Sequence, residues 1–324
     1  MNNRESQIAD QIRELDEKGY CVIEGVLAAD KCATHKEGIE RYLANCGIDV
    51  KDPALRHSEY PSIHGIIQHL EFGQSKAVWD VRQEESVAAV FERMFGDNDL
   101  LVSFDGGCVM LPYYTDNPNS RWWHVDQSHG RRGRRCIQGY VNLTDSHDEA
   151  SGSLAVIVGS HKLHDKFGDE NPAAVAVRDD WYKFTPEQLE ALPGARIRVH
   201  GGVGSLVLWD SRTIHQNMAP PKTVAARRSR YVVYTCFQPR KLISKADLKK
   251  KQKAFDEYRM TTHWPASRVK LFSKSWRTYG KEAKRFPIVR DRQLSPRMLE
   301  LAGKTALTTR TRKLAPPLLE FAKE

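Results

Sequence analysis

Three residues carry side chains that are able to bind one metal ion, although they lie far apart in the chain. His124 and Asp126 belong to RWWHVDQS, a run with the character of a β-strand. Residues i and i+2 of a strand point to the same face, so the imidazole and the carboxylate are expected side by side. His215, just after the strand-like run GSLVLW, is a candidate third ligand. Two histidines and one carboxylate are typical of non-haem iron(II) oxygenases, whereas a His-x-Asp tripeptide alone also fits an ordinary strand edge.

Arginines follow the distal histidine in the run RRSRYVVYTCFQ, which reads as another strand. Arg228 and Arg230 are separated by two positions, so both side chains could point to the interior. A buried guanidinium requires a bidentate anionic partner, and a dicarboxylate co-substrate would supply one. Arg227 fits an exposed strand-edge position better than Arg230 does.

A second group of arginines follows the first two candidate ligands and is predicted to lie in a loop at the mouth of the site. A cluster of this kind attracts phosphate, carboxylate or nucleic-acid backbone, although loop arginines are often only solvated. Trp122 and Trp123 alternate in direction, so one is expected in the core and the other in the pocket, and Trp123 is taken as a candidate substrate contact. His129 lies beyond the predicted strand and outside the metal cluster. The arginines are Arg131, Arg132, Arg134 and Arg135.

The elements that must position these residues are short β-strands. Between about residues 100 and 240 the sequence contains at least seven apolar runs of strand length divided by turn residues, which predicts a β-sandwich or barrel. Amphipathic helices are expected at 4–19, 29–46 and 84–96, and a strand at GYCVIEGVL. Further helices are predicted in SKADLKKKQKAFDEYRM, SKSWRTYGKEAKRF and LSPRMLELAGK. We therefore predict one domain over 1–324, with a helical flank (1–99), a β-core (100–240) and a basic helical extension (241–324).

Composition limits the class of protein. With 40% hydrophobic and 28% charged residues, the 324-residue chain is expected to be globular. No run reaches the roughly 18 apolar residues of a membrane span, and the first twenty residues hold no secretory h-region. The six cysteines form no CxxC pair, which fits reduced thiols in a cytoplasmic protein.

Charge is distributed unevenly along the sequence. Residues 241–324 hold 22 Lys+Arg against 8 Asp+Glu, a net charge of +14, and the other 240 residues carry a net charge of −5. A basic extension of this kind is able to bind nucleic acid, although a solvated helical surface is its commoner meaning.

Three stretches resemble the phytanoyl-CoA dioxygenase family of iron(II)/2-oxoglutarate-dependent oxygenases. They are WHVDQS, the pair QGYVNLTD and SGSLAVIVGSHK, and SLVLWDSRTIHQN followed by Arg230. The resemblance spans residues 85–238 and implies a mainly β core with flanking helices, a double-stranded β-helix of the jelly-roll, cupin-like type. It implies that His124, Asp126 and His215 bind Fe(II).

The resemblance also implies that 2-oxoglutarate and O2 are co-substrates. Arg230 would hold the distal carboxylate of 2-oxoglutarate, but the gap of fifteen positions after His215 is long for the family, so Arg228 stays an alternative. The weaker candidates for lining the same pocket are Gln138, Tyr140 and Asn217.

The aspartate in His-x-Asp bears on the type of reaction. Related halogenases resemble this pattern with glycine or alanine at that position, so Asp126 favours hydroxylation of a C–H bond, with release of succinate and CO2. We expect a small or medium-sized, anionic substrate. Two alternatives remain open: a nucleic-acid-modifying oxygenase with the same iron centre, and a non-catalytic ligand-binding β-barrel.

Overall fold

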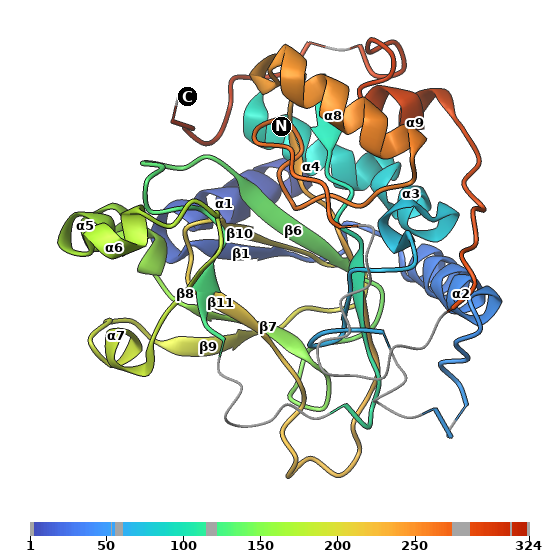
Figure 1. Cartoon of the computed structure of the whole chain (residues 1–324), viewed down its shortest axis with the longest axis horizontal. Helices are drawn as coiled ribbons and strands as arrows, with labels where there is room; N and C mark the ends of the chain where they lie inside the picture. Colours follow the sequence, from blue (N-terminus) through green and yellow to red (C-terminus); the bar gives the residue numbers. More distant parts are fainter. Residues whose placement is uncertain are drawn as a thin grey trace.

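Two antiparallel β-sheets face each other at the centre of the molecule (Figure 1). The computed structural model describes residues 3–52, 54–55, 61–114, 122–273, 286–311 and 313–322. The larger sheet has the order β1 (Tyr20–Ile23), β10 (Leu206–Asp210), β6 (Ile137–Asn142), β12 (Arg230–Tyr234), β4 (Gly107–Met110) and β2 (Ile66–Ile67). The smaller sheet has the order β8 (Tyr182–Lys183), β5 (His124–Val125), β11 (His215–Met218), β7 (Ser153–Ile157) and β9 (Arg196–Val199). A two-stranded sheet pairs β13 (Phe237–Pro239) with β3 (Leu100–Val102).

The predicted fold class, a mainly β core with flanking helices, is confirmed. The core has the two facing sheets of a double-stranded β-helix, and the described strands do not join into a closed barrel. Two strands, β1 and β2, come from the N-terminal segment and pair with β10 and β4. Residues 1–99 therefore add to the larger sheet as well as covering it with helices.

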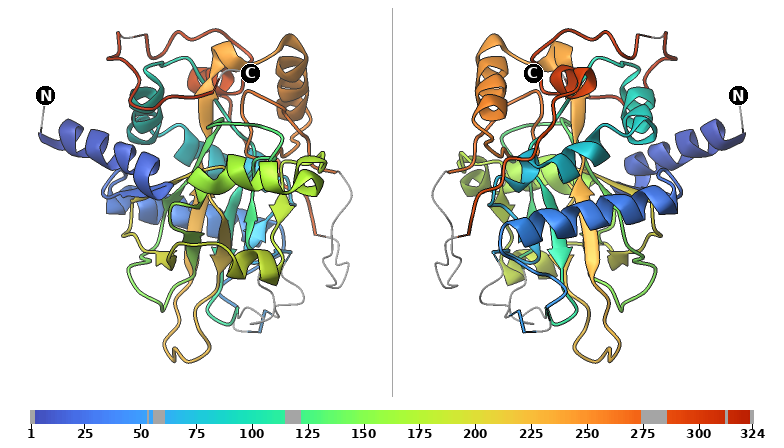
Figure 2. Two further views of the ribbon diagram at one scale, coloured as in Figure 1. Left: turned by 90° about the vertical axis from the view of Figure 1, so that its left-hand side faces the viewer. Right: turned by 90° about the vertical axis from the view of Figure 1, so that its right-hand side faces the viewer.

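Helices gather mainly on the outer side of the larger sheet (Figures 1 and 2). Helix α1 packs on β1 and β10, α4 on β13, and α9 on β3. Helices α5, α6 and α7 lie at one end of the smaller sheet. The bounds of the α-helices are α1 Asn3–Lys18, α2 Ala29–Asn45, α3 Lys76–Arg82, α4 Glu85–Phe95, α5 His164–Glu170, α6 Pro172–Val175, α7 Pro186–Glu190, α8 Lys245–Asp256 and α9 Pro296–Leu301. Short 3-10 helices occupy η1 Phe72–Gln74, η2 Ser160–Leu163 and η3 Arg240–Leu242.

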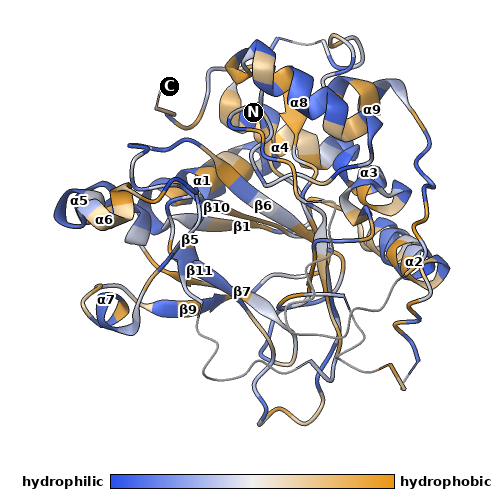
Figure 3. Cartoon of the chain, in the orientation of Figure 1, coloured by the Kyte–Doolittle hydropathy of each residue, from blue (hydrophilic) through white to orange (hydrophobic). Residues whose placement is uncertain are grey.

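The predicted helices correspond to α1, α2, α4, α8 and α9. Apolar and polar residues alternate along α4, α8 and α9, as expected of helices with one buried side (Figure 3). Gly96 ends α4 in a left-handed conformation, which glycine adopts without steric cost. The helix predicted in SKSWRTYGKEAKRF lies almost wholly in residues 274–285, outside the described part of the chain. No helix among the described residues is long and apolar enough to cross a membrane.

Alternation along the strands divides the side chains between two environments. In β6, Ile137 and Val141 belong to the large hydrophobic core beneath the helices, whereas Tyr140 belongs to the cluster between the sheets. In β5, Val125 faces the outer cluster of the smaller sheet, and His124 faces inward. The polar candidates of the sequence therefore point into the space between the sheets, because their apolar neighbours are buried on the opposite faces.

Candidate metal centre

The three candidate metal ligands come together between the sheets. His124 on β5 and His215 on β11 are direct partners in the antiparallel register, and their ring centroids are 4.3 Å apart. The carboxylate of Asp126 lies 3.6 Å from His124 Nε2 and 3.3 Å from His215 Nε2. Within the described residues these side chains form a group whose ligand atoms all lie within 4.8 Å of one another. One metal ion is thus able to reach all three.

The β-strand that carries the first ligands is shorter than the sequence predicts. Strand β5 contains only two residues, and Asp126 follows its end. The backbone N–H of Asp126 donates to the carbonyl of Ser211 (3.1 Å), which keeps the chain in place beyond the last ladder bond. His124 and Asp126 therefore remain neighbours as the alternation predicted, although the second is held by a loop contact.

Backbone carbonyls fix the orientation of both imidazoles. His124 Nδ1 lies 2.9 Å from the carbonyl of Trp122, and His215 Nδ1 lies 2.9 Å from that of Thr213. A carbonyl oxygen can only accept, so each Nδ1 carries the proton and each Nε2 presents a lone pair toward Asp126. Metal-binding histidines commonly have this outer hydrogen bond, which sets the tautomer and the direction of the ring.

Electrostatics favour the metal-binding protonation states of His124 and Asp126. Burial lowers the pKa of His124, and the neighbouring His215 lowers it further. Burial by itself raises the pKa of Asp126, but His124 and His215 outweigh it and hold this pKa well below its usual range. A neutral imidazole and an ionised carboxylate are the forms that coordinate iron(II), so the donor set fits this ion.

Arg230 and Arg228, left as alternatives by the sequence, have different environments. The Arg230 side chain is buried (1% exposed), and its Nη1 donates to Asn217 Oδ1 at 2.8 Å. Arg228 precedes β12, and its exposed guanidinium pairs with Asp145 and Asp148. The connection leads from β11 in the smaller sheet to β12 in the larger sheet, and β12 begins at Arg230. Arg228 therefore lies in the connection, and Arg230 is the first arginine of this segment whose side chain points inward. Only Arg230 lies in the interior that also holds the metal ligands.

Of the weaker candidates, Tyr140 and Asn217 contact Arg230, and Gln138 lies two residues before Tyr140 on the same face of β6. The guanidinium lies 4.8 Å from the ring centroid of Tyr140, and Asn217 Nδ2 donates to the carbonyl of His64 at 2.7 Å. Two buried donors, Arg230 Nε and Gln138 Nε2, have no hydrogen-bond partner among the described residues. Unsatisfied buried donors are costly, so the free donor of Arg230 fits an anionic acceptor such as a carboxylate group.

Comparison with known proteins decides the family. A family model described as Phytanoyl-CoA dioxygenase (PhyH) matches residues 15–228, about two thirds of the chain. The chain belongs to the phytanoyl-CoA dioxygenase family. It is thus a non-haem iron(II)/2-oxoglutarate-dependent enzyme that uses O2 as a co-substrate.

Individual relatives of this phytanoyl-CoA dioxygenase family protein are distant. Ava biosynthesis cluster protein O of Aspergillus versicolor is 26% identical over 265 residues, which cover 78% of this chain and 84% of the relative. Among solved structures, the epimerase SnoN in complex with Fe3+, alpha ketoglutarate and nogalamycin RO is 16% identical with a TM-score of 0.48, over 73% of this chain and 85% of that one. HygX from Streptomyces hygroscopicus with nickel and 2-oxoglutarate bound is 15% identical with a TM-score of 0.46, over 71% and 86%.

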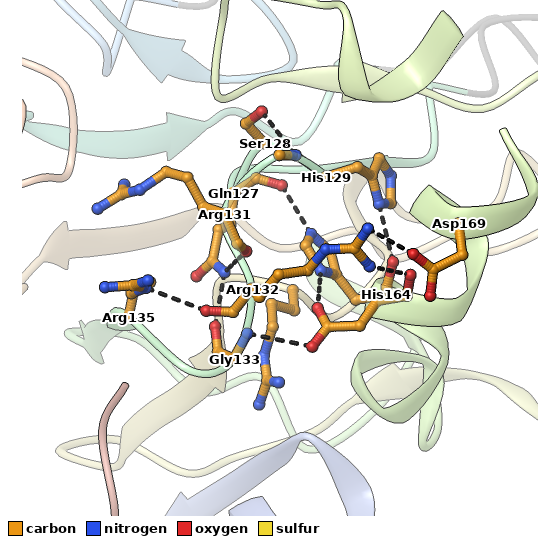
Figure 4. A network of polar contacts seen from close by, with 12 residues as sticks. Gln127, Ser128, His129, Arg131, Arg132, Gly133, Arg135, His164 and Asp169 are labelled. Carbon is orange, nitrogen blue, oxygen red and sulfur yellow. Dashed lines mark hydrogen bonds and ion pairs between the residues drawn. The ribbon is translucent and has the colours of Figure 1, made fainter. Parts of the chain in front are cut away.

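The arginine loop of this family member differs from the predicted cluster of substrate-facing cations. Arg134 is buried, with Nε at 3.0 Å from Asp210 and Nη2 at 2.5 Å from Asp16. Arg132 pairs with Asp169 at 2.6 Å (Figure 4). The guanidinium of Arg131 stacks 4.2 Å from a ring centroid of Trp264, and Arg135 Nε donates to the carbonyl of Arg132. Asp210 and Asp16 engage Arg134 in the interior, whereas Arg132 forms a more exposed pair with Asp169.

The roles expected of the two adjacent tryptophans are exchanged. Trp123 belongs to the outer cluster with Val125, so the prediction that it contacts the substrate is wrong. Trp122 stacks on His124 with ring centroids 4.6 Å apart and donates from Nε1 to the carbonyl of Asn217. The same alternation that pairs His124 with Asp126 also places Trp122 on their face, so the signal was present in the sequence.

His129 lies outside the metal cluster, as predicted, but it is buried. Its ring stacks on His164 with centroids 4.4 Å apart and contacts Phe167 and Phe184. Burial, with a smaller contribution from His164, lowers its pKa to about 4. His129 is therefore a neutral core residue that packs the loop against α5 (Figure 4).

Sequence reasoning missed other aromatic residues near the ligands. His64 stacks on Trp122, and Trp181 contacts His124. The imidazole of His263 experiences the charge of Asp126. These residues lie in segments without a motif, and only the folded chain brings them to the site.

Proposed function

We propose that this chain is an iron(II)/2-oxoglutarate-dependent dioxygenase that hydroxylates a C–H bond of a small or medium-sized molecule, with release of succinate and CO2. His124, Asp126 and His215 hold the iron in this proposal, and Arg230 holds the distal carboxylate of 2-oxoglutarate. Iron with 2-oxoglutarate and O2 supplies the oxidising chemistry, and the protein positions the substrate and limits access of water.

One observation carries the proposal: the metal-ligand group shares one interior with a buried guanidinium whose Nε has no hydrogen-bond partner among the described residues. Asn217, which accepts from Arg230, lies two residues beyond His215 on the same face of β11. Two residues of a strand span about 6.8 Å, a separation that an extended five-carbon dicarboxylate is able to bridge. A ligand chelated at the metal would thus place its far carboxylate at Arg230, with Gln138 and Tyr140 on the opposite sheet.

The substrate in this proposal is a small molecule without a required anionic group. The prediction of an anionic substrate depended on the arginine loop, whose guanidinium groups have partners within the protein. The relative from Aspergillus versicolor is named for a biosynthesis cluster, which supports a small-molecule substrate here. Asp126 occupies the position that separates hydroxylases from halogenases, and this supports hydroxylation.

Nucleic acid is not supported as a substrate. The basic C-terminal residues form ion pairs with acidic residues of the preceding 240 positions, so much of the separated charge is neutralised on folding. These pairs include Lys241–Asp97, Arg268–Asp180, Lys270–Asp179, Arg290–Glu71 and Arg310–Glu92.

The test is anaerobic absorption spectroscopy with Fe(II) and 2-oxoglutarate. The wild-type protein is expected to give a visible metal-to-ligand charge-transfer band, and His124→Ala and Asp126→Ala are expected to lose it. His147→Ala, which removes an exposed imidazole, is the matched control and should keep the band. Absence of the band in wild-type protein, or its persistence in both ligand variants, would contradict the proposed site.

A screen of small molecules in air then tests the reaction. Substrates are expected to raise succinate release and to gain one oxygen atom, measured by mass spectrometry. Succinate release coupled only to an oxidised product without added oxygen would contradict hydroxylation while leaving the enzyme class intact.

A further inference from the structure

An exposed indole lies directly against one of the candidate metal ligands. Trp181 is 44% exposed, and its ring centroid is 5.8 Å from that of His124. Of the tryptophans that the structure describes, it is the only one in the exposed class. Its place beside the metal centre makes the indole a surface that a ligand bound there would be able to cover, with burial of apolar area.

Two segments hold Trp181 in this position. The carboxylate of Asp179, two residues before Trp181, accepts from the backbone N–H of Asp180 at 2.9 Å and pairs with Lys270 at 2.8 Å. Asp180 accepts from the backbone N–H of Ser128 at 3.3 Å and pairs with Arg268 at 3.3 Å. The backbone segment that carries the indole is therefore attached to the loop that follows Asp126 and to the C-terminal segment.

The C-terminal segment brings an unsatisfied imidazole to the same place. His263 precedes Trp264, whose ring stacks on Arg131, and Arg131 also lies 3.6 Å from Asp180. The buried Nε2 of His263 has no hydrogen-bond partner among the described residues. The His263 ring lies 5.0 Å from the ring of Trp264, centroid to centroid, and Trp264 joins it through Arg131 to Asp180, the residue before Trp181; the nearby charge of Asp126 agrees with this place.

We propose that Trp181 and His263 form the substrate-recognition face, and that the substrate presents a flat unsaturated ring to the indole and a hydroxyl or carbonyl group to the imidazole. The inference rests on the proposed function, because it assigns a substrate class to that site. Aromatic stacking suits Trp181, since offset ring pairs gain attraction beyond the burial of area. A hydrogen bond from the ligand would satisfy His263 Nε2, whose burial without a partner is costly.

The position of His263 in the chain bears on specificity. The family model ends at residue 228, whereas His263, Arg268 and Lys270 lie beyond that limit. The metal ligands come from the part of the chain that the family shares, and half of the recognition face comes from outside it. Part of the choice of substrate therefore depends on a segment outside the range that the family model matches.

Three probe molecules test the two contacts separately in protein loaded anaerobically with Fe(II) and 2-oxoglutarate. 2-Naphthol is flat and carries a hydroxyl group, decahydro-2-naphthol keeps the hydroxyl but is not flat, and naphthalene is flat without the hydroxyl. Binding is measured by calorimetry, and the charge-transfer band is recorded in the same samples. Wild-type protein should bind 2-naphthol about tenfold more tightly than its saturated analogue, the effect of about 1.4 kcal/mol of stacking.

Variants of Trp181 and of His263 should change the affinity for different probes. Trp181→Leu should remove the preference for the flat ring, and Trp181→Phe should restore much of it. His263→Leu should weaken 2-naphthol about fivefold without affecting naphthalene, since a net hydrogen bond is worth about 1 kcal/mol. Leu242→Ala, which shortens an exposed apolar side chain on η3, is the control and should change neither.

The outcomes separate this inference from the proposed function. If the charge-transfer band forms but 2-naphthol and decahydro-2-naphthol bind equally, or none of the probes binds, the recognition face is wrong and the proposed function stands. An unchanged 2-naphthol affinity in Trp181→Leu, in protein that keeps the band, also overturns it. If the band never forms, the proposed function itself fails.

Discussion

His124 and His215 lie directly opposite each other on adjacent antiparallel strands, with their ring centroids 4.3 Å apart. The pairing of β5 with β11 therefore builds two thirds of the candidate metal site from residues 91 positions apart in the chain. A shift of one residue in this register would turn one imidazole to the outer face. Metal binding thus reports directly on correct pairing within the smaller sheet.

Replacement of Arg230 should weaken 2-oxoglutarate binding far more than replacement of Arg228. A hydrogen bond to a charged group contributes about 1.5–3 kcal/mol, so Arg230→Met is expected to raise the Kd of 2-oxoglutarate by roughly 10- to 150-fold. Arg228→Met removes only exposed ion pairs and should change the Kd less than about twofold. Calorimetric titration of the Fe(II)-loaded variants measures both values, and equal losses would argue against Arg230 as the anchor.

Replacement of Trp123 should affect the stability of the fold, whereas replacement of Trp122 should affect the spectrum of the metal site. Trp123→Ala leaves a cavity in the outer cluster and should lower the free energy of unfolding by about 3–5 kcal/mol. Trp122→Leu removes the ring stacked on His124 and should shift the iron–2-oxoglutarate charge-transfer band. Urea unfolding and anaerobic absorption spectra test the pair; a band shifted by Trp123→Ala but not by Trp122→Leu would reverse their assignments.

The arginines of the loop should differ in their contribution to stability. Arg134→Met removes a buried partner of Asp210, and we expect a loss of about 3 kcal/mol, at the low end for a buried pair because Arg212 still contacts this carboxylate. Arg132→Met breaks a more exposed pair with Asp169 and should cost less than about 1 kcal/mol. If chemical denaturation gave similar losses of unfolding free energy for the two variants, both arginines would be equally solvated and the prediction would be wrong.

Stability should depend on the protonation of His129 between about pH 6.5 and pH 4. Its pKa is lowered to about 4 in the folded protein, mainly by burial, and is about 6.5 in the unfolded chain. As the pH falls through this window the unfolded state binds a proton that the folded state does not, so stability decreases with falling pH and is unaffected above the window. The His129 contribution at pH 5 is roughly 2 kcal/mol below that at pH 7.

His129→Phe removes this titration and keeps an aromatic ring in the cluster. The difference in unfolding free energy between wild type and variant, measured in urea at pH 7 and pH 5, should shift in favour of the variant at the lower pH. A difference that does not change with pH would contradict the burial of a neutral imidazole.

The sequence by itself determined the β-core and the residue types of the metal site. Strand alternation put His124 and Asp126 on one face, and this relationship depends only on local backbone geometry. The same rule put the site candidates on β6 on one face of that strand. It also indicated that Trp122 shares the face of His124, although the prediction chose Trp123. Helices α1, α2 and α4 were likewise evident, because their apolar spacing is local.

Only the tertiary structure decided which distant residues share the site. The crossing from β11 to β12 placed Arg230 in the interior and left Arg228 exposed, and acidic side chains far away in the chain paired with Arg132 and Arg134. Trp181 and His263 reach the metal centre through ion pairs between separate segments. Long-range pairing and burial are set by the whole fold, so spacing along the sequence does not reveal them.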